Sequence, residues 1–319
     1  MRPAAARAAL LLVASVVACG GGARPEEAPA PAASSRTASG DLLVFERKLG
    51  RGKEDLYLVP AAGGVERRLT DDPAVDLLPR FTPDGRSVVF SSDRSGRFQL
   101  WEVAVDGGPA RRLLRNDAEE WQADPSPDGR RIAFLSDRDG PISLFILDRS
   151  TGATRLLVRH GARTDLGNPN WSPDGRRIVF SSNKGVAGHH VYVVDVATGE
   201  QTRESGYLAG ACEPRFSRDG RRVAFVDRSH LSRGHSRIVE RDLRSGEEKV
   251  LVDWPALNYD PVYSPDGSEI AFASTLAGAN DIYRLRLSDG KSWRVTFGPG
   301  ASRHPDYRPV RLPPHGSSP

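Results

Sequence analysis

A four-residue turn motif recurs five times along the 319-residue chain and constrains the fold more than any other feature. The copies begin at Thr82, Ser126, Ser172, Ser217 and Ser264, at intervals of 44, 46, 45 and 47 residues. Four copies read Ser/Thr-Pro-Asp-Gly, and the copy at Ser217 has Arg218 where the others have proline. Proline, aspartate and glycine at these positions suit a tight turn. Because roughly 40–50 residues make one four-stranded propeller blade, the motif predicts an all-β protein with the β-propeller fold.

The two ends of the repeat array predict how the ring closes. Leu42–Phe45, Asp55–Val59 and Val65–Leu69 have the pattern of second, third and fourth strands, with no first strand before them. Arg303–Tyr307 has the pattern of a first strand with nothing after it. An unpaired strand edge invites pairing with other chains, and ring closure removes it. We therefore expect a six-bladed β-propeller of four-stranded blades, closed by the C-terminal strand joining the N-terminal blade.

The first forty residues do not continue the repeat. Arg2 and Arg7 form a positively charged region before an apolar stretch, Ala8–Val17. This stretch is shorter than the roughly 20 residues of a membrane span, and Cys19 follows it closely. This arrangement resembles the lipobox of bacterial lipoproteins, so residues 1–19 are predicted to be a lipoprotein signal peptide with Cys19 as the lipidated residue. The alternative is a plain secretory signal in which Cys19 is incidental.

The rest of the chain divides into three parts by composition. Residues 20–40 are rich in Ala, Pro, Gly and Ser and are predicted to be a flexible linker. Residues 41–310 carry the repeats and form the predicted propeller, and residues 311–319 are a predicted disordered tail. With lipid on Cys19, we expect a cell-envelope protein anchored in the outer membrane and facing the periplasm.

The charge distribution excludes some partners. The net charge is +4, and only five of the 45 basic residues are lysine. The arginines are scattered, whereas nucleic-acid binding needs a clustered basic face. The sequence has neither a phosphate-binding glycine loop nor a dinucleotide fingerprint. We therefore expect no nucleic-acid partner and no cofactor, and we expect a monomer.

Propeller topology sorts the loops onto two faces. The turn motifs and the glycine turns between third and fourth strands are short, and they share what we call the turn-motif face. The loops between second and third strands, and the links between blades, are longer and more varied; they share the long-loop face. Because functional residues concentrate on loops held by a rigid scaffold, the long-loop face is the predicted binding face.

One position on the long-loop face is polar in five of the six repeats. It is the residue before the inner-strand proline, or its equivalent: Leu78, Gln122, Asn168, Glu213, Asp260 and His304. The five polar members are a candidate binding ring, around one channel mouth, for a peptide or a small ligand. The alternative is structural, because polar side chains there also cap loop amides, which need partners in any case.

Histidines raise the question of a metal site on the same face. Six are assigned to it: His160, His189, His190, His230, His235 and His304. The pairs His189/His190 and His230/His235 fall on adjacent blades, but no HExxH spacing is present. We predict solvated loop histidines and no metal site.

The repeat resembles a known family. Pro169–Ser181 reads Pro-x-aromatic-Ser-Pro-Asp-Gly-Arg-x-Ile-x-Phe-x-Ser, which is similar to the six-bladed propeller repeats of TolB and its relatives and, more distantly, to prolyl-oligopeptidase propellers. The resemblance covers residues 41–310 and implies the fold. Residues 20–40 leave no room for the N-terminal α/β domain of TolB, so its known Tol and lipoprotein partners do not carry over directly. No G-x-S-x-G nucleophile motif of the peptidases is present.

Two functions from different classes follow. The first is a non-enzymatic, lipid-anchored propeller that binds a protein or peptide partner in the cell envelope, with Trp121, Tyr207, Trp254 and Tyr259 as aromatic anchors. The alternative is an envelope hydrolase or lyase acting on glycan or peptide at the channel mouth. It would use Glu213 and Asp260, on neighbouring blades, as the paired acid and base.

Overall fold

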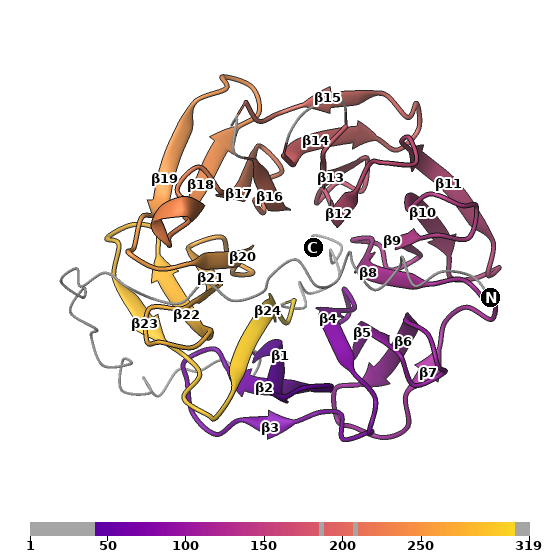
Figure 1. The fold of residues 1–319 in the computed structure, drawn as a ribbon, viewed down its shortest axis with the longest axis horizontal. Coiled ribbons are helices and arrows are strands. Elements are labelled where there is room, and N and C mark those ends of the chain that lie inside the picture. Colours follow the sequence, from indigo (N-terminus) through magenta and orange to yellow (C-terminus); the bar gives the residue numbers. More distant parts are fainter. Residues whose placement is uncertain (1–41, 185–187, 207–209, 310–319) are drawn as a thin grey trace, which may run out of the picture.

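A computed structural model describes residues 42–184, 188–206 and 210–309. The predicted signal peptide with Cys19, the linker 20–40 and the tail 311–319 lie outside the described residues. The described residues form six four-stranded antiparallel sheets arranged in a ring around a central channel, which confirms the predicted six-bladed β-propeller (Figure 1). Among these residues, no helix is both long and apolar enough to cross a membrane.

The first three blades follow the predicted strand order from the channel outward. Blade 1 consists of β24 (Ala301–Tyr307), β1 (Leu42–Gly50), β2 (Lys53–Pro60) and β3 (Arg67–Arg68). Blade 2 consists of β4 (Asp76–Phe81), β5 (Ser87–Ser92), β6 (Gln99–Ala104) and β7 (Arg111–Arg112). Blade 3 consists of β8 (Glu120–Pro125), β9 (Arg131–Ser136), β10 (Ser143–Asp148) and β11 (Thr154–Arg159).

The other three blades repeat this order. Blade 4 consists of β12 (Leu166–Trp171), β13 (Arg177–Ser182), β14 (His190–Asp195) and β15 (Gln201–Arg203). Blade 5 consists of β16 (Ala211–Phe216), β17 (Arg222–Asp227), β18 (Arg237–Asp242) and β19 (Glu248–Val252), with a short 3₁₀ helix, η2 (Leu231–Arg233), between β17 and β18. Blade 6 consists of β20 (Asn258–Tyr263), β21 (Glu269–Ser274), β22 (Asp281–Arg286) and β23 (Ser292–Arg294).

The ring closes through β24, as the sequence predicts. This strand pairs antiparallel with β1, from Leu43 opposite Tyr307 to Lys48 opposite Ala301. Figure 1 shows the yellow C-terminal strand beside the indigo N-terminal strand. The first and last parts of the fold are thus joined by hydrogen bonds, and β1 has no free edge on the channel side.

The core consists of six apolar clusters, each shared by two adjacent blades. The second strand of each blade contributes a fully buried phenylalanine at the same position: Phe45, Phe90, Phe134, Phe180, Phe225 and Phe272. Burying each ring stabilises the fold by about 2 kcal/mol. Because each cluster needs both neighbours, no blade has a complete core of its own.

The turn motifs form as predicted and also link the blades. In the copy at Ser126, the hydroxyl group donates to Asp128 at 2.5 Å and accepts from the Arg131 amide at 2.9 Å. Gly129 adopts the left-handed conformation with φ +69°, which glycine adopts without strain. A Cβ atom on Gly129 would lie 3.9 Å from the Pro83 ring of the preceding motif. Neighbouring motifs therefore pack against one another around one channel mouth.

Deleting residues from Gly300 onward tests the closure. The variant loses β24 and Tyr307, a buried member of the cluster between blades 1 and 6, and exposes the edge of β1. We expect the melting temperature to fall by more than about 10 °C, because loss of several kcal/mol shifts a domain of this size by that amount. A matched variant lacking only residues 311–319 should have the same melting temperature as the full chain. If all three proteins melted at the same temperature, the result would contradict closure of the ring by β24.

Candidate functional site

Six equivalent inner-strand residues share one backbone conformation, and they are the six that the sequence aligned. Their φ angles lie between 50° and 58°: Leu78, Gln122, Asn168, Glu213, Asp260 and His304. We call them the bulge ring, because the register between first and second strands shifts at this point in every blade. A non-glycine residue in this conformation costs of order 1–3 kcal/mol. A strain repeated in six blades needs a compensating interaction.

At five junctions between blades, that interaction is a hydrogen bond from one blade to the next. Gln122 Oε1 accepts from the Asn168 amide at 2.6 Å, and Glu213 Oε2 accepts from the Asp260 amide at 2.7 Å. Asp260 Oδ2 in turn accepts from the His304 amide at 3.3 Å. In these contacts the polar side chains cap backbone amides, which is the structural alternative to ligand binding that the sequence allowed.

Two blades use a substitute acceptor on the second strand. Leu78 has no acceptor, and there Ser91 Oγ accepts from the Gln122 amide at 3.2 Å. In blade 1 the ring member is His304, and Glu46 Oε2 accepts from the Leu78 amide at 2.8 Å. An acceptor is therefore supplied even where the ring side chain cannot provide one.

Three members of the bulge ring, Glu213, Asp260 and His304, form a charged cluster with Arg303 and Glu46. The guanidinium Nη2 atom of Arg303 lies 3.0 Å from Asp260 Oδ2 and 3.4 Å from Glu213 Oε1. His304 Nε2 lies 3.2 Å from Asp260 Oδ1, and its Nδ1 lies 2.9 Å from Glu46 Oε1. The cluster pairs its own cations and anions at this mouth.

The carboxyl groups of the cluster titrate differently. Burial, reinforced by the charge of Asp260, raises the pKa of Glu213 from 4.5 to about 7, against the opposing effect of Arg303. Burial also disfavours the Asp260 anion, but Arg303 and His304 outweigh it and hold the pKa of Asp260 below 3.8. For His304, Asp260 and Glu46 outweigh burial and raise the pKa above 6.5. Burial and neighbouring charges therefore move the pKa values of the two carboxyl groups in opposite directions, upward for Glu213 and downward for Asp260.

The prediction of solvated loop histidines is wrong for His160, for His190 and for His304, which lies on β24 and pairs with Glu46 and Asp260. His160 is 7% exposed, and its ring nitrogens lie 2.9 Å from Ser182 Oγ and 2.9 Å from Gln201 Oε1. His190 is also buried. His230 and His235 stack with ring centroids 4.8 Å apart. Within the described ranges no group of three or more His, Cys, Asp or Glu side chains is placed to hold a metal ion.

The aromatic residues predicted as interface anchors pack inward. Tyr259 is buried, with Arg303 stacked 4.6 Å from its ring centroid. Trp254 packs against Phe272 at 5.0 Å, and Trp121 packs on the cluster between blades 3 and 4. Tyr207 lies outside the described residues. For Trp121, Trp254 and Tyr259, core packing is sufficient to explain why the residue is aromatic.

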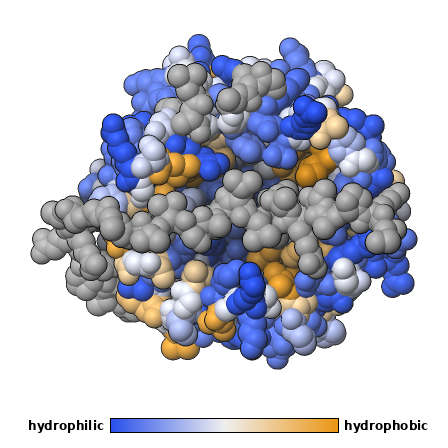
Figure 2. All heavy atoms as spheres, in the orientation of Figure 1, coloured by the Kyte–Doolittle hydropathy of each residue, from blue (hydrophilic) through white to orange (hydrophobic). Residues whose placement is uncertain are grey.

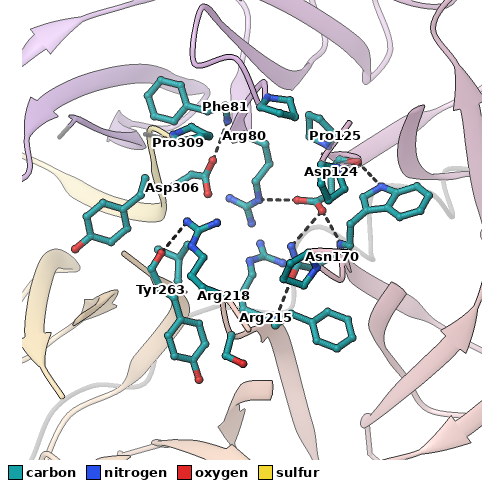
Figure 3. Close-up of a pocket in the computed structure, with 18 residues that line it drawn as sticks. Arg80, Phe81, Asp124, Pro125, Asn170, Arg215, Arg218, Tyr263, Asp306 and Pro309 are labelled. Carbon is teal, nitrogen blue, oxygen red and sulfur yellow. Dashed lines mark hydrogen bonds and ion pairs between the residues drawn. The ribbon is translucent and has the colours of Figure 1, made fainter. Parts of the chain in front are cut away.

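The inner strands carry a second ring, two residues beyond the bulge ring and nearer the turn-motif face. We call it the channel ring, and its members are Arg80, Asp124, Asn170, Arg215, Val262 and Asp306. They line a pocket of about 270 Å³ together with turn-motif residues that include Pro83, Pro127, Pro173 and Arg218 (Figure 3). The pocket therefore lies among the turn motifs, whereas the sequence predicts binding on the long-loop face.

The channel ring also caps amides of the next blade. Asp124 Oδ2 accepts from the Trp171 amide at 2.8 Å, and Asn170 Oδ1 accepts from the Phe216 amide at 2.9 Å. Asp306 Oδ2 accepts from the Phe81 amide at 2.8 Å. Burial raises the pKa of Asp124 to about 7 although Arg80 opposes the shift, and burial likewise raises the pKa of Asp306.

Sequence reasoning missed the three arginines of this pocket. Arg80 and Arg215 stand two residues after the aligned bulge positions, and the period of two in a strand places them on the channel side as well. Arg218 breaks the turn motif at its proline, and this departure was the visible signal. Its Nε and Nη2 atoms donate to the carbonyls of Ser264 and Tyr263 at 3.0 and 3.1 Å, so it bridges blades 5 and 6.

Six four-stranded blades around a polar channel, joined by two tiers of side-chain caps, define a closed six-bladed β-propeller. The family model for the TolB β-propeller domain matches residues 26–196 and 166–311. The chain therefore belongs to the TolB β-propeller domain family.

Individual relatives agree with this assignment over part of their length. The Tol-Pal system protein TolB of Francisella tularensis subsp. mediasiatica is 27% identical over 183 residues, 42% of this chain and 41% of the relative. TolB of Bordetella pertussis is 53% identical over 47 residues, 14% of this chain and 11% of the relative. The crystal structure of TolB from Acinetobacter baumannii superimposes with a TM-score of 0.74 at 20% identity, over 85% of this chain and 67% of that one. The chain spans less than half the length of these curated relatives.

Glu213→Gln tests the electrostatics of the bulge ring. The amide retains an oxygen that can accept from Asp260 but removes the ionisable group. In the native protein the stabilising contribution of the neutral Glu213 side chain is complete below pH 4.5 and is lost as the pH rises through about 7. We therefore expect the variant to gain stability relative to the native protein between pH 5 and pH 8, by about 2 kcal/mol.

The measurement is denaturant unfolding of both proteins at the two pH values. The exposed Glu200→Gln is the matched control, and its difference from the native protein should stay constant with pH. A pH-independent difference for Glu213→Gln would contradict the assignment.

Proposed function

We propose that this chain is a lipid-anchored cell-envelope propeller that binds a protein or peptide partner and catalyses no reaction. Membership of the TolB β-propeller domain family supports an envelope role, since curated relatives are Tol-Pal system proteins. The proposal concerns the class of partner, because the chain matches only part of those relatives.

The observation that carries the proposal is how the channel-mouth carboxylates are engaged. A raised carboxyl pKa such as that of Glu213 is also typical of a catalytic acid. However, Glu213 Oε2 accepts from the Asp260 amide and Oε1 faces Arg303, while Asp260 binds Arg303 and the His304 amide. A general acid must present its proton to substrate, and these atoms are directed at neighbouring blades. The geometry supports a rigid recognition scaffold over the alternative hydrolase or lyase.

The surface fits a polar mode of recognition. Figure 2 shows one face whose described residues are mainly hydrophilic, with hydrophobic residues in separate spots. The large exposed apolar side chains of the described residues are spread over four blades: Leu49 and Val65 in blade 1, Leu156 in blade 3, Val250 in blade 5, and Phe297 just after the last strand of blade 6. Single exposed apolar residues are ordinary on a soluble surface. Polar contacts at a channel mouth are therefore the better candidates for binding.

The lipid anchor is part of the proposal. A tether of the composition of residues 20–40 would leave the propeller free to move near the membrane and raise its effective concentration at a membrane-bound partner. We place the anchor on Cys19, in the outer membrane, with the propeller in the periplasm.

Cys19→Ser tests the anchor, because thioether lipidation requires the thiol. We expect the variant to leave the membrane fraction when cells are lysed and fractionated. Cys212→Ser, in the partly buried site on β16, is the matched control and should stay with the membrane. Retention of Cys19→Ser in the membrane fraction would overturn the lipid anchor.

Photo-crosslinking in intact cells tests partner binding. A crosslinkable residue is placed at exposed Arg176 on the turn-motif face or at exposed Arg163 on the long-loop face. We expect one defined protein adduct from one face, identified by mass spectrometry, and little from the other. No adduct from either face, or turnover of an envelope glycan or peptide that Glu213→Gln abolishes, would contradict the proposal.

A further inference from the structure

Three arginines converge on the pocket of the turn-motif face. Arg80 comes from blade 2, Arg215 from the opposite blade 5, and Arg218 from the turn motif of blade 5. Figure 3 shows their guanidinium groups turned toward the middle of the pocket. Arg80 and Arg215 are only 6% and 7% exposed. Buried arginines are rare unless their charge is paired.

Their partners in the described part of the chain are few. Arg215 donates from Nη1 to the Pro214 carbonyl at 3.2 Å and has no ion pair among the described residues. Arg80 donates to the Pro79 carbonyl at 2.8 Å, and its Nε lies 3.8 Å from Asp124 Oδ1. A guanidinium group has five N–H donors. Most donors of Arg215 therefore remain for a ligand in the pocket.

The pocket has an excess of positive charge. Three guanidinium groups share it with two carboxyl groups, Asp124 and Asp306. Both carboxyl groups already accept from backbone amides of the next blade. The opposite mouth differs, because there Arg303 is paired with Asp260 and Glu213. At the turn-motif mouth, by contrast, Arg215 has no ion pair among the described residues and can meet an incoming anion.

The chemistry and size of the pocket select the ligand. Arginine forks match carboxylates with two parallel hydrogen bonds. A volume of about 270 Å³ is at the low end of ligand sites and admits one or two side chains. Pro83, Pro127, Pro173 and Pro309 line the same pocket, and their fixed rings limit its rearrangement.

We propose that this pocket binds a carboxylate of an acidic peptide segment through Arg80, Arg215 and Arg218. The inference rests on the proposed function in one respect, namely that the partner is a protein or peptide. The segment enters from the turn-motif face, its carboxylate lies between the guanidinium groups, and the proline rim contacts its backbone.

The test uses a defined probe and a variant that restores the repeat. The probe is an acetylated, amidated peptide of four glutamates, titrated by calorimetry into the purified full chain, with a four-glutamine peptide as the matched probe. Arg218→Pro carries the residue that the other four turn motifs have, so it is expected to fold. We expect the glutamate peptide to bind, the glutamine peptide not to bind, and Arg218→Pro to weaken binding about tenfold.

Two further variants complete the experiment. Arg215→Ala should weaken binding about tenfold or more, with folding checked by its melting curve. Exposed Arg176→Ala, on the same face but outside the pocket lining, should bind within twofold of the native chain. The inference would be overturned if the glutamate peptide did not bind, or if Arg218→Pro and Arg215→Ala bound it as tightly as the native chain. A chain that binds inorganic phosphate but does not bind the glutamate peptide would also overturn the inference, because that result indicates a site for small anions.

The outcomes separate this inference from the proposed function. If the peptide fails to bind while crosslinking still captures a partner, the pocket assignment is wrong and partner binding stands. If the peptide binds as expected but no partner is captured, the pocket assignment stands and the proposed function is wrong.

Discussion

The structure depends on a bulge that turns one inner-strand residue of each blade into the left-handed conformation. At Glu213 and Gln122 this geometry directs the side chain to the amide of the next blade, at 2.7 and 2.6 Å. A neutral hydrogen bond contributes about 1 kcal/mol, and leaving the buried amide unpaired would cost more. The local strain is therefore offset by contacts between blades, and the ring of caps supports the channel wall from within.

Three of the six members of the channel ring follow the same rule, and Arg80 is an instructive member that does not. Asp124, Asn170 and Asp306 each accept from an amide of the next blade. Arg80 occupies the same position but has no acceptor to offer. The residue it would cap is Pro125, which has no amide hydrogen. Arg80 therefore leaves no amide of the next blade without its cap, whereas the counterpart of Arg215 is Tyr263, which has an amide hydrogen.

The repeat made most of the fold predictable. The spacing of the five turn motifs together with the unmatched ends led to six blades, and the closing strand predicted at Arg303–Tyr307 is observed at Ala301–Tyr307. The bulge ring was found by alignment, because proline follows it in most blades. Its backbone conformation was not predictable, because Leu78 and Glu213 are residue types that rarely have a positive φ. The burial of His160 depends on Ser182 and Gln201, which are distant in sequence, and the pocket arginines come from opposite blades.

The central claim is that the bulge ring joins blades, while open cationic donors lie at the other mouth. Amide hydrogen exchange of Asn168 in the native chain and in Gln122→Leu tests it most directly, since leucine occupies the same ring position in blade 2. The account predicts that the Asn168 amide is protected in the native chain and exchanges at least about tenfold faster in the variant, with the Asp260 amide unchanged. Equal protection of Asn168 in both proteins would contradict it.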